Sequence, residues 1–226
     1  MRSEKLRSEK AAARVTLMLV VSLLAVAPGL LAQPRHGRLF PPEDLGLLES
    51  PDRDVWQKPE RIMDALGIAD GAKVADVGAG GGWFTVRLAR RVGPNGRVFA
   101  EDLQPQMLEA TRRRAAREGL RNIIYKQGSA SDPMLPSATL DAVLMIDAYG
   151  EIPNPLLFLQ NVRASLRDGG RVGIVDYKLQ GGGPGPAPFR TPPDPASVEE
   201  VARAAGLTLV SRETFLPFQF FLVFAR

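Results

Sequence analysis

The fold of this 226-residue chain is decided by the stretch Val74-Ala75-Asp76-Val77-Gly78-Ala79-Gly80-Gly81-Gly82-Trp83-Phe84-Thr85. In this stretch a short apolar run ends in an acid, four glycines fall within five positions, and a helix-compatible run follows. The pattern predicts a strand, a tight turn and the start of a helix, the unit with which an α/β sheet holds a nucleotide-like ligand. Glycine suits the turn because a residue without Cβ adopts positive φ freely and lets a ligand touch the backbone. An ordinary glycine-rich turn is the alternative, since a lone glycine motif is a weak signal.

The composition is that of one globular domain. The chain is 45% hydrophobic and 24% charged, and it is long enough to bury a sizeable core. Its net charge of +4 is concentrated at the N-terminus, where residues 1–14 hold five basic and two acidic side chains. The remaining residues are nearly balanced, so the charge gives no argument for nucleic-acid binding.

The scarcity of two residue types excludes several kinds of site. The chain has no cysteine, which excludes disulfides, thiolate metal sites and cysteine nucleophiles. Its only histidine is His36, which excludes a histidine-based triad and a metal site with several histidines. We therefore expect no metal centre.

The N-terminal residues have the pattern of a targeting segment. A basic, polar start is followed by an uncharged apolar run of 13 residues at 15–27 and by Pro28-Gly29 before Ala32. The pattern is typical of a secretory signal peptide and an exported protein; an uncleaved membrane anchor, or a mis-assigned start codon on a cytoplasmic protein, are the alternatives. We expect a signal peptide or anchor at 1–32, a linker at 33–51 and the folded domain at 52–226.

Strands and helices alternate along the domain. An early helix with one apolar face is expected near 55–66, with its start delayed by Pro59. The expected strands are 73–77, 97–102, 122–127, 141–147, 171–177, 207–214 and 219–224, and the later helices are 83–91, 105–118, 155–166 and 197–205. This order predicts an α/β, doubly wound, mostly parallel seven-stranded sheet of Rossmann-like type, with the last strand antiparallel. Residues 178–195 are too rich in glycine and proline for regular structure.

An acid at the end of the second expected strand makes the glycine turn more specific. Asp102 follows Gly82 by 20 residues, where a doubly wound fold places the acid that accepts hydrogen bonds from a ribose. NAD, FAD and S-adenosylmethionine (SAM) use such a site. A dinucleotide turn needs a third small residue so that helix and strand pack closely, and Trp83 stands at that position. The pattern present, with Asp76 and glycines at 78, 80 and 82, favours SAM, which needs an acid near its amino group.

Together these motifs resemble the class I SAM-dependent methyltransferases. The acidic motif at 98–108, the third strand with Gly128-Ser129-Ala130, the fourth strand at 140–145 and the turn at 166–172 follow the glycine motif in the family's order. The resemblance covers residues 55–226. It implies a Rossmann-like methyltransferase fold with SAM as the cofactor.

The resemblance also implies which residues contact the cofactor. By that resemblance the glycine turn faces the methionine part, Asp102 binds the ribose hydroxyls and Leu103 packs on adenine. Many family members carry Asp at the position of Ser129, so this chain departs from the family's pattern at the contact to the adenine amino group. The implied cofactor site consists of Asp76, Gly78, Ala79, Gly80, Gly82, Asp102, Leu103, Ser129 and Ala130.

Within the family, the chain resembles a UbiE-like subgroup known as type 11. The segment Asp147-Ala148-Tyr149-Gly150-Glu151 looks like its D-x-Y-H-E motif, but Gly150 stands where the subgroup has His. A base that depends on this His is therefore missing here. The remaining candidates for catalysis are Asp147 and Tyr149, with Glu151, Asp176 and Tyr177 at neighbouring strand ends.

The sequence therefore predicts an enzyme that moves a methyl group from SAM to a small or lipophilic acceptor, mainly by proximity and orientation. No nucleic-acid partner is expected, and a membrane is expected only through the N-terminal segment. Two alternatives stay open: a non-catalytic SAM-binding module on the same fold, and an NAD(P)-dependent oxidoreductase.

Overall fold

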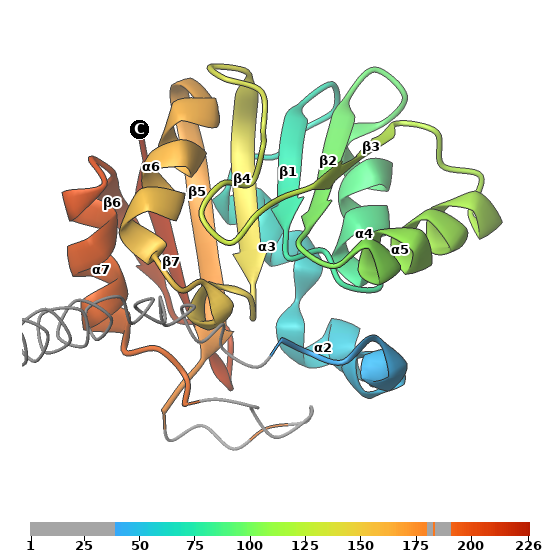
Figure 1. The fold of residues 1–226 in the computed structure, drawn as a ribbon, viewed down its shortest axis with the longest axis horizontal. Coiled ribbons are helices and arrows are strands. Elements are labelled where there is room, and N and C mark those ends of the chain that lie inside the picture. The colour runs from blue at the N-terminus through green and yellow to red at the C-terminus, as the bar shows by residue number, and fades with distance from the viewer. Residues whose placement is uncertain (1–38, 180–182, 184–190) are drawn as a thin grey trace, which may run out of the picture. The chain divides into compact units, whose positions relative to one another are not determined.

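The computed structural model describes residues 39–179, 183 and 191–226. Within these residues the chain forms one seven-stranded sheet with the order β3-β2-β1-β4-β5-β7-β6 (Figure 1). The strands are β1 (Lys73–Val77), β2 (Arg97–Asp102), β3 (Ile123–Gln127), β4 (Leu140–Ile146), β5 (Leu166–Tyr177), β6 (Thr208–Glu213) and β7 (Gln219–Ala225). The expected N-terminal signal or anchor at 1–32 lies outside the described residues, as does most of the loop expected at 178–195.

The sheet is parallel from β3 to β5 and antiparallel at its other end. Strand β1 pairs with β2 and with β4, so the chain runs outward to β3 and then returns to the opposite side of β1. Strand β7 pairs antiparallel with both β5 and β6. The doubly wound fold class is confirmed. Its switch point lies between β1 and β4, where sheets of this kind bind ligands beyond the carboxyl ends of the strands.

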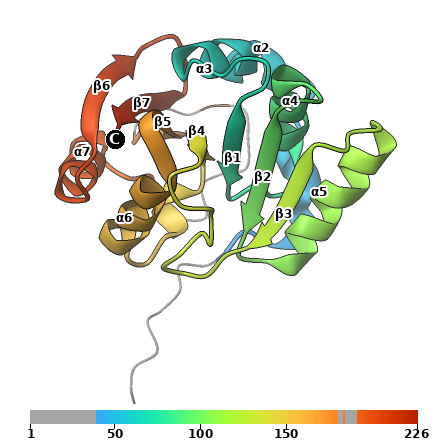
Figure 2. The same ribbon diagram turned by 90° about the horizontal axis from the view of Figure 1, so that it is seen from above.

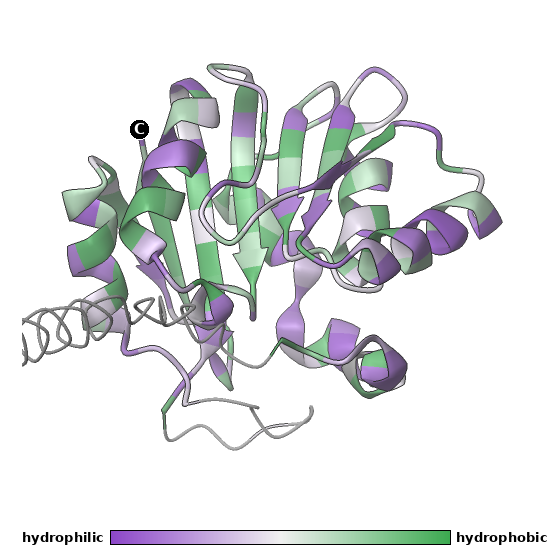
Figure 3. Ribbon diagram, in the orientation of Figure 1, coloured by the Kyte–Doolittle hydropathy of each residue, from purple (hydrophilic) through white to green (hydrophobic). Residues whose placement is uncertain are grey.

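Helices cover both faces of the sheet (Figure 2). One core cluster joins the sheet to α6 and α7, and the other joins it to α3 and α4. The helices are α2 (Arg53–Gln57), α3 (Pro59–Ala65), α4 (Trp83–Val92), α5 (Pro105–Arg117), α6 (Pro155–Ser165) and α7 (Pro195–Ala204), with 3-10 helices η1 (Pro42–Leu48) and η2 (Tyr149–Glu151). Because both faces are covered, β4 is apolar along most of its length, as Figure 3 shows, and Asp141 near its start is the exception.

Several local expectations are confirmed. The first two strands have the expected bounds at both ends. The Asn154 side chain caps α6 by accepting a hydrogen bond from the Leu157 amide at 3.3 Å. Proline opens α5 and α6, where its missing N–H is not needed.

The early helix near 55–66 is not one helix but two. Lys58 separates α2 from α3 with a left-handed φ of 49°. The physical reason is Pro59, which has no N–H for a continuous helix and disfavours helical backbone at the preceding residue. Because the axis changes there, Val55 does not join the buried face and is 75% exposed.

Besides shifts of one or two residues at other boundaries, three further segments differ from the expectation. Strand β5 begins at Leu166, which pairs with Leu140 across a register shift, so the turn expected at 168–170 lies within its bounds. Asp147 lies outside β4 and has a positive φ of 55°. Part of the stretch expected to be a linker, 33–51, forms η1 and belongs to the same compact unit as the sheet. No helix within 39–179 and 191–226 has the length and apolarity that a membrane crossing requires.

Candidate functional site

A cavity of about 210 Å³ lies at the switch point of the sheet. It is lined at the carboxyl ends of four strands, by Val77 of β1, Asp102 of β2, Ile146 of β4 and Tyr177 of β5. Figure 1 shows α2 beyond the arrowhead of β4, at this same edge. The topology therefore brings together side chains that are far apart in the sequence.

The glycine turn forms one wall of the cavity. Gly80 lines it, has φ 53°, and leaves open space where a Cβ would stand. Its carbonyl oxygen accepts a hydrogen bond from Thr111 Oγ1 at 2.7 Å. Gly78 and Ala79 also line the cavity, and both of their amides donate to the Glu101 carbonyl oxygen at 2.9 Å. The turn is thus held on both sides and presents bare backbone to a ligand.

Gly82 is needed for another reason than ligand contact. It does not line the cavity; it stands just before α4 with φ 78°. A Cβ there would lie 2.7 Å from Thr111 Cγ2. Gly82 therefore lets α4 and α5 approach each other, a role the sequence pattern alone does not reveal.

Asp102 faces the cavity from the end of β2. Its Oδ2 accepts a hydrogen bond from the Gly80 amide and its Oδ1 one from the Gln104 amide, both at 2.9 Å. Burial raises the pKa of Asp102, while these backbone donors and that of Leu103 act in the opposite direction. The carboxyl group is therefore fixed to the glycine turn, and each of its oxygens retains capacity to accept a further hydrogen bond.

Two other buried acids stand beside Asp102. Burial raises the pKa of Asp76 to about 6, although the Thr85 hydroxyl donates to its carboxyl group at 2.5 Å. Burial, reinforced by the Asp102 charge, raises the pKa of Glu101 to about 8. Both line the cavity. The side of the cavity that these three acids line therefore favours a cationic ligand, whose charge would stabilise their ionised forms.

Leu103, Ser129 and Ala130 line the same side of the cavity. The Ser129 hydroxyl is engaged in its own loop, where it accepts from the Asp132 amide at 3.1 Å and donates to the Asp132 carbonyl oxygen at 3.2 Å. Ser129 thus shapes the loop, and Leu103 offers an apolar surface.

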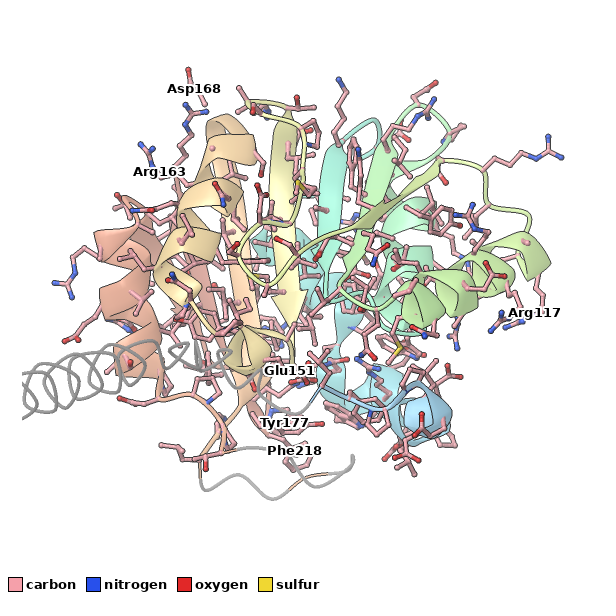
Figure 4. The ribbon with its side chains drawn as sticks, in the orientation of Figure 1. Arg117, Glu151, Arg163, Asp168, Tyr177 and Phe218 are labelled. Atoms are coloured by element: carbon pink, nitrogen blue, oxygen red, sulfur yellow. The ribbon has the colours of Figure 1, made fainter. Side chains whose placement is uncertain are left out.

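The other end of the cavity carries the candidates for catalysis. Asp147, Glu151, Asp176 and Tyr177 all line it. Figure 4 shows Glu151 and Tyr177 at this end of the sheet, with Asp168 at the opposite end. Burial raises the pKa of Tyr177, and the Asp147 charge raises it further, so this phenol stays protonated at neutral pH.

Tyr149 is placed differently from the expectation. Its side chain is buried in the core cluster under α6 and is not among the residues that line the cavity. The short helix η2 turns it inward, and burial raises its pKa to about 12. Trp56 packs edge-on against Phe218, with the ring centroids 6.1 Å apart, and is not among the lining residues either.

The N-terminal part of the domain supplies lining residues that sequence reasoning missed. Leu39, Phe40 and Leu45 reach the cavity, and Gln104 Nε2 donates to the Phe40 carbonyl oxygen at 2.9 Å. Arg53 also lines the cavity, and its guanidinium lies 4.2 Å from the Trp83 ring centroid. The sequence offered one signal for this role: the expected linker at 33–51 contains apolar and aromatic residues although it is otherwise rich in proline and charge.

Trp83 has a structural role beyond the position it occupies in the glycine pattern. Arg87 stacks on the same ring at 3.5 Å, so Trp83 contacts two guanidinium groups. Arg87 also forms an ion pair with Asp54 at 2.8 Å, which ties α2 to α4. The indole therefore holds α2 at the mouth of the glycine turn.

The cavity as a whole is acidic. Among the described lining residues, one side chain, Arg53, is basic. The acidic side chains are Glu49, Asp76, Glu101, Asp102, Asp147, Glu151 and Asp176. In the described part of the chain no three potential ligands converge on a point that could hold a metal ion.

Comparison with known proteins identifies the family. A model described as a methyltransferase domain matches residues 74–170. A protein-L-isoaspartate O-methyltransferase of Methanothrix thermoacetophila is 30% identical over 146 residues, which are 60% of this chain and 67% of that protein. The ubiquinone/menaquinone biosynthesis C-methyltransferase UbiE of Pasteurella multocida is 29% identical over 54% of this chain, and the chain spans less than half (46%) of its length.

Solved structures agree with these matches. A SAM-dependent methyltransferase from Aquifex aeolicus superposes with a TM-score of 0.76 at 25% identity, over 82% of this chain and 98% of that one. The fold also matches a SAM-bound phosphoethanolamine N-methyltransferase of Haemonchus contortus, with a TM-score of 0.62 at 16% identity over 76% of this chain and 52% of that one. The matches do not favour a dinucleotide-dependent oxidoreductase or a non-catalytic module. The chain belongs to the class I SAM-dependent methyltransferases, and its cofactor is SAM.

Proposed function

We propose that this protein transfers a methyl group from SAM to a small acceptor with a largely apolar body. The observation that carries the proposal is the hydrogen bond between the Gly80 amide and the Asp102 carboxyl group inside a single cavity. It joins bare backbone from the turn after β1 to an acceptor group from β2, the combination that a ribose-bearing ligand needs at a switch point.

The lining residues fit SAM in charge and shape. The Asp102 oxygens suit the ribose hydroxyls, and Leu103 offers an apolar surface for adenine. SAM carries a positive sulfonium and a positive amino group, which reduce the cost of ionising Asp76 and Glu101. Its carboxylate suits the guanidinium of Arg53.

The chain contributes mainly position to the reaction. SAM supplies an activated methyl group, which bonds to an electron pair of the acceptor while the carbon–sulfur pair stays on sulfur. Asp147, at the other end of the cavity, is our candidate for accepting the proton that the acceptor loses.

The remaining lining indicates an apolar acceptor. Ile152, Pro153 and Phe158 line the acceptor end, and Leu39 and Phe40 line the cavity from the N-terminal side. Several relatives are named as methyltransferases of ubiquinone or menaquinone biosynthesis. A reduced quinone is therefore the first acceptor that we propose to test.

Calorimetry with the full chain tests cofactor binding. We expect SAM to bind, and Asp102→Ala to weaken binding by at least about tenfold, since hydrogen bonds to a charged group are lost. Asp168→Ala, an exposed acid at the far end of the sheet, is the matched control and leaves the affinity unchanged. Absence of SAM binding by the wild type would refute the proposal.

Formation of S-adenosylhomocysteine tests turnover. The full chain is mixed with SAM and reduced naphthoquinone, phenol or phosphoethanolamine, and product is measured by mass spectrometry. We expect methylation of an apolar acceptor and none of phosphoethanolamine. Preference for the charged acceptor would contradict the apolar assignment.

A further inference from the structure

Four polar side chains form one continuous hydrogen-bonded chain beside the cavity. Arg53 Nε donates to Gln57 Oε1 at 2.6 Å, and Gln57 Nε2 donates to Gln219 Oε1 at 3.0 Å. Gln219 Nε2 then donates to both carboxyl oxygens of Asp147, at 2.8 and 3.0 Å. The chain joins α2, the first residue of β7 and the residue that follows β4.

The two amides of this chain are buried and lie outside the cavity lining. Gln57 is 0% exposed, Gln219 is 1% exposed, and neither lines the cavity. Burying amides costs free energy that their hydrogen bonds only offset, whereas apolar side chains of the same size would fill the space without that cost. Their value therefore lies in what they hold in place.

The direction of the chain is determined at its cationic end. A guanidinium has donors and no acceptor, so Gln57 must turn its oxygen toward Arg53 and its N–H₂ group toward Gln219. Gln219 must then present its oxygen to Gln57 and its N–H₂ group to Asp147. Each amide orientation follows from the previous one.

Asp147 is restrained from a second side as well. Its backbone has a φ of 55°, which is uncommon for a residue other than glycine, and its amide donates to the Val175 carbonyl oxygen at 2.9 Å. Backbone and side chain together direct the carboxyl group at the end of the cavity that we assign to the acceptor.

We propose that Gln219 is a positioning residue that holds Asp147 ionised and oriented toward the acceptor, and that Gln57 keeps the Gln219 amide in the required direction. The inference rests on the proposed function, since it assigns Asp147 to the acceptor end. Because the Gln219 N–H₂ group donates to both carboxyl oxygens of Asp147, it stabilises the ionised form of Asp147 relative to the protonated form. Two of the other titratable groups, Arg53 from α2 and Tyr177 from β5, interact electrostatically with Asp147. The acidic groups that share its cavity are Glu49, Asp76 from β1, Glu101 and Asp102 from β2, Glu151 from η2 and Asp176 from β5.

Carbon-13 NMR of the Asp147 carboxyl group tests this directly in the full chain, without cofactor or acceptor. Asp147→Asn assigns the signal. Gln219→Met keeps the volume and removes the donor, so the Asp147 titration midpoint should rise by about one pH unit, a tenfold change in the ionisation constant. Gln57→Met should raise it by less. Ser165→Ala removes another buried hydrogen bond, from Ser165 Oγ to the Val162 carbonyl oxygen, and should leave the midpoint unchanged.

A second measurement needs no variant at residue 219. In the wild type, the Gln219 side-chain N–H₂ signals should titrate with the same midpoint as the Asp147 carboxyl carbon. The proposal would be overturned if the Asp147 titration midpoint were the same in the wild type and in Gln219→Met. It would also be overturned if the Gln219 N–H₂ chemical shifts did not change as Asp147 titrates. If Gln219→Met does not fold, the wild-type amide titration decides. SAM calorimetry on the same samples separates the two hypotheses, because it tests the proposed function and the NMR titration does not.

Discussion

The three alternating glycines of the turn satisfy one sequence pattern for three different physical reasons. Gly80 faces open space, a Cβ on Gly78 would lie 2.5 Å from the Ala148 Cβ, and a Cβ on Gly82 would press on Thr111. Gly80 leaves room for a ligand, whereas Gly78 and Gly82 leave room for the protein's own side chains. A glycine motif therefore records how closely the protein packs on itself as well as what it binds.

Replacement of Gly82 by alanine should separate these effects. Gly82 and Gly119 both have positive φ, 78° and 68°, but a Cβ on Gly119 would meet nothing within 4 Å. We expect Gly119→Ala to lower the free energy of unfolding by about 1 kcal/mol through backbone strain alone. Gly82→Ala should cost about 1–3 kcal/mol more because of the contact with Thr111. Urea unfolding measures the free energy of unfolding of both variants. Equal losses would show that Thr111 moves away from the new Cβ without cost.

At the scale of elements, the sheet was predictable and the N-terminal helices were not. Strands such as β1 and β4 are short and mostly apolar and are bounded by turn residues, so local sequence specifies them. The contribution of η1 and α2 to the cavity depends on contacts with distant parts of the chain. No local pattern indicates that Gln57 pairs with Gln219, 162 residues away. The sequence could bring the glycine turn and Asp102 together because both fall in motifs, and both line the cavity. No sequence signal indicates that η2 turns Tyr149 inward, away from the cavity lining.

The attachment of α2 should depend on the Arg87 side chain. Arg87→Gln removes the ion pair with Asp54 and one of the two stacked guanidiniums on Trp83. We expect faster amide hydrogen exchange in residues 53–57, with about 1 kcal/mol or less lost from global stability because Asp54 is exposed. Arg212→Gln removes a comparable ion pair, with Glu199, and should leave this exchange unchanged. Unchanged exchange in Arg87→Gln would show that α2 is held by other contacts.

At the scale of the whole molecule, the acidic cavity links folding to pH. Burial raises the pKa of Glu101 to about 8 and that of Asp76 to about 6, whereas unfolded carboxyl groups titrate near about 4. The folded state therefore keeps protons that the unfolded state has lost. Their stabilising contribution is complete below about pH 4 and disappears as the pH rises toward about 8.

We therefore predict that the cofactor-free protein loses stability between about pH 4.5 and 8, by at most about 1.4 kcal/mol per pH unit for each group. Glu101→Gln should flatten this slope. Glu109→Gln, an exposed acid on α5, should not. Urea unfolding across the range measures the slopes, and a wild type whose stability rises with pH would contradict burial of these two acids as the cause.

The place of β7 in the sheet affects the order in which the contacts of the cavity can form during synthesis. The glycine turn and Asp102 follow or end β1 and β2, which leave the ribosome early. Strand β7 is the last strand made, yet it lies between β5 and β6 and carries Gln219. A growing chain that stops short of residue 219 has an unpaired edge on β5 and an Asp147 without its amide donor. The Asp147 carboxyl group therefore gains this hydrogen bond only after the final strand has been made.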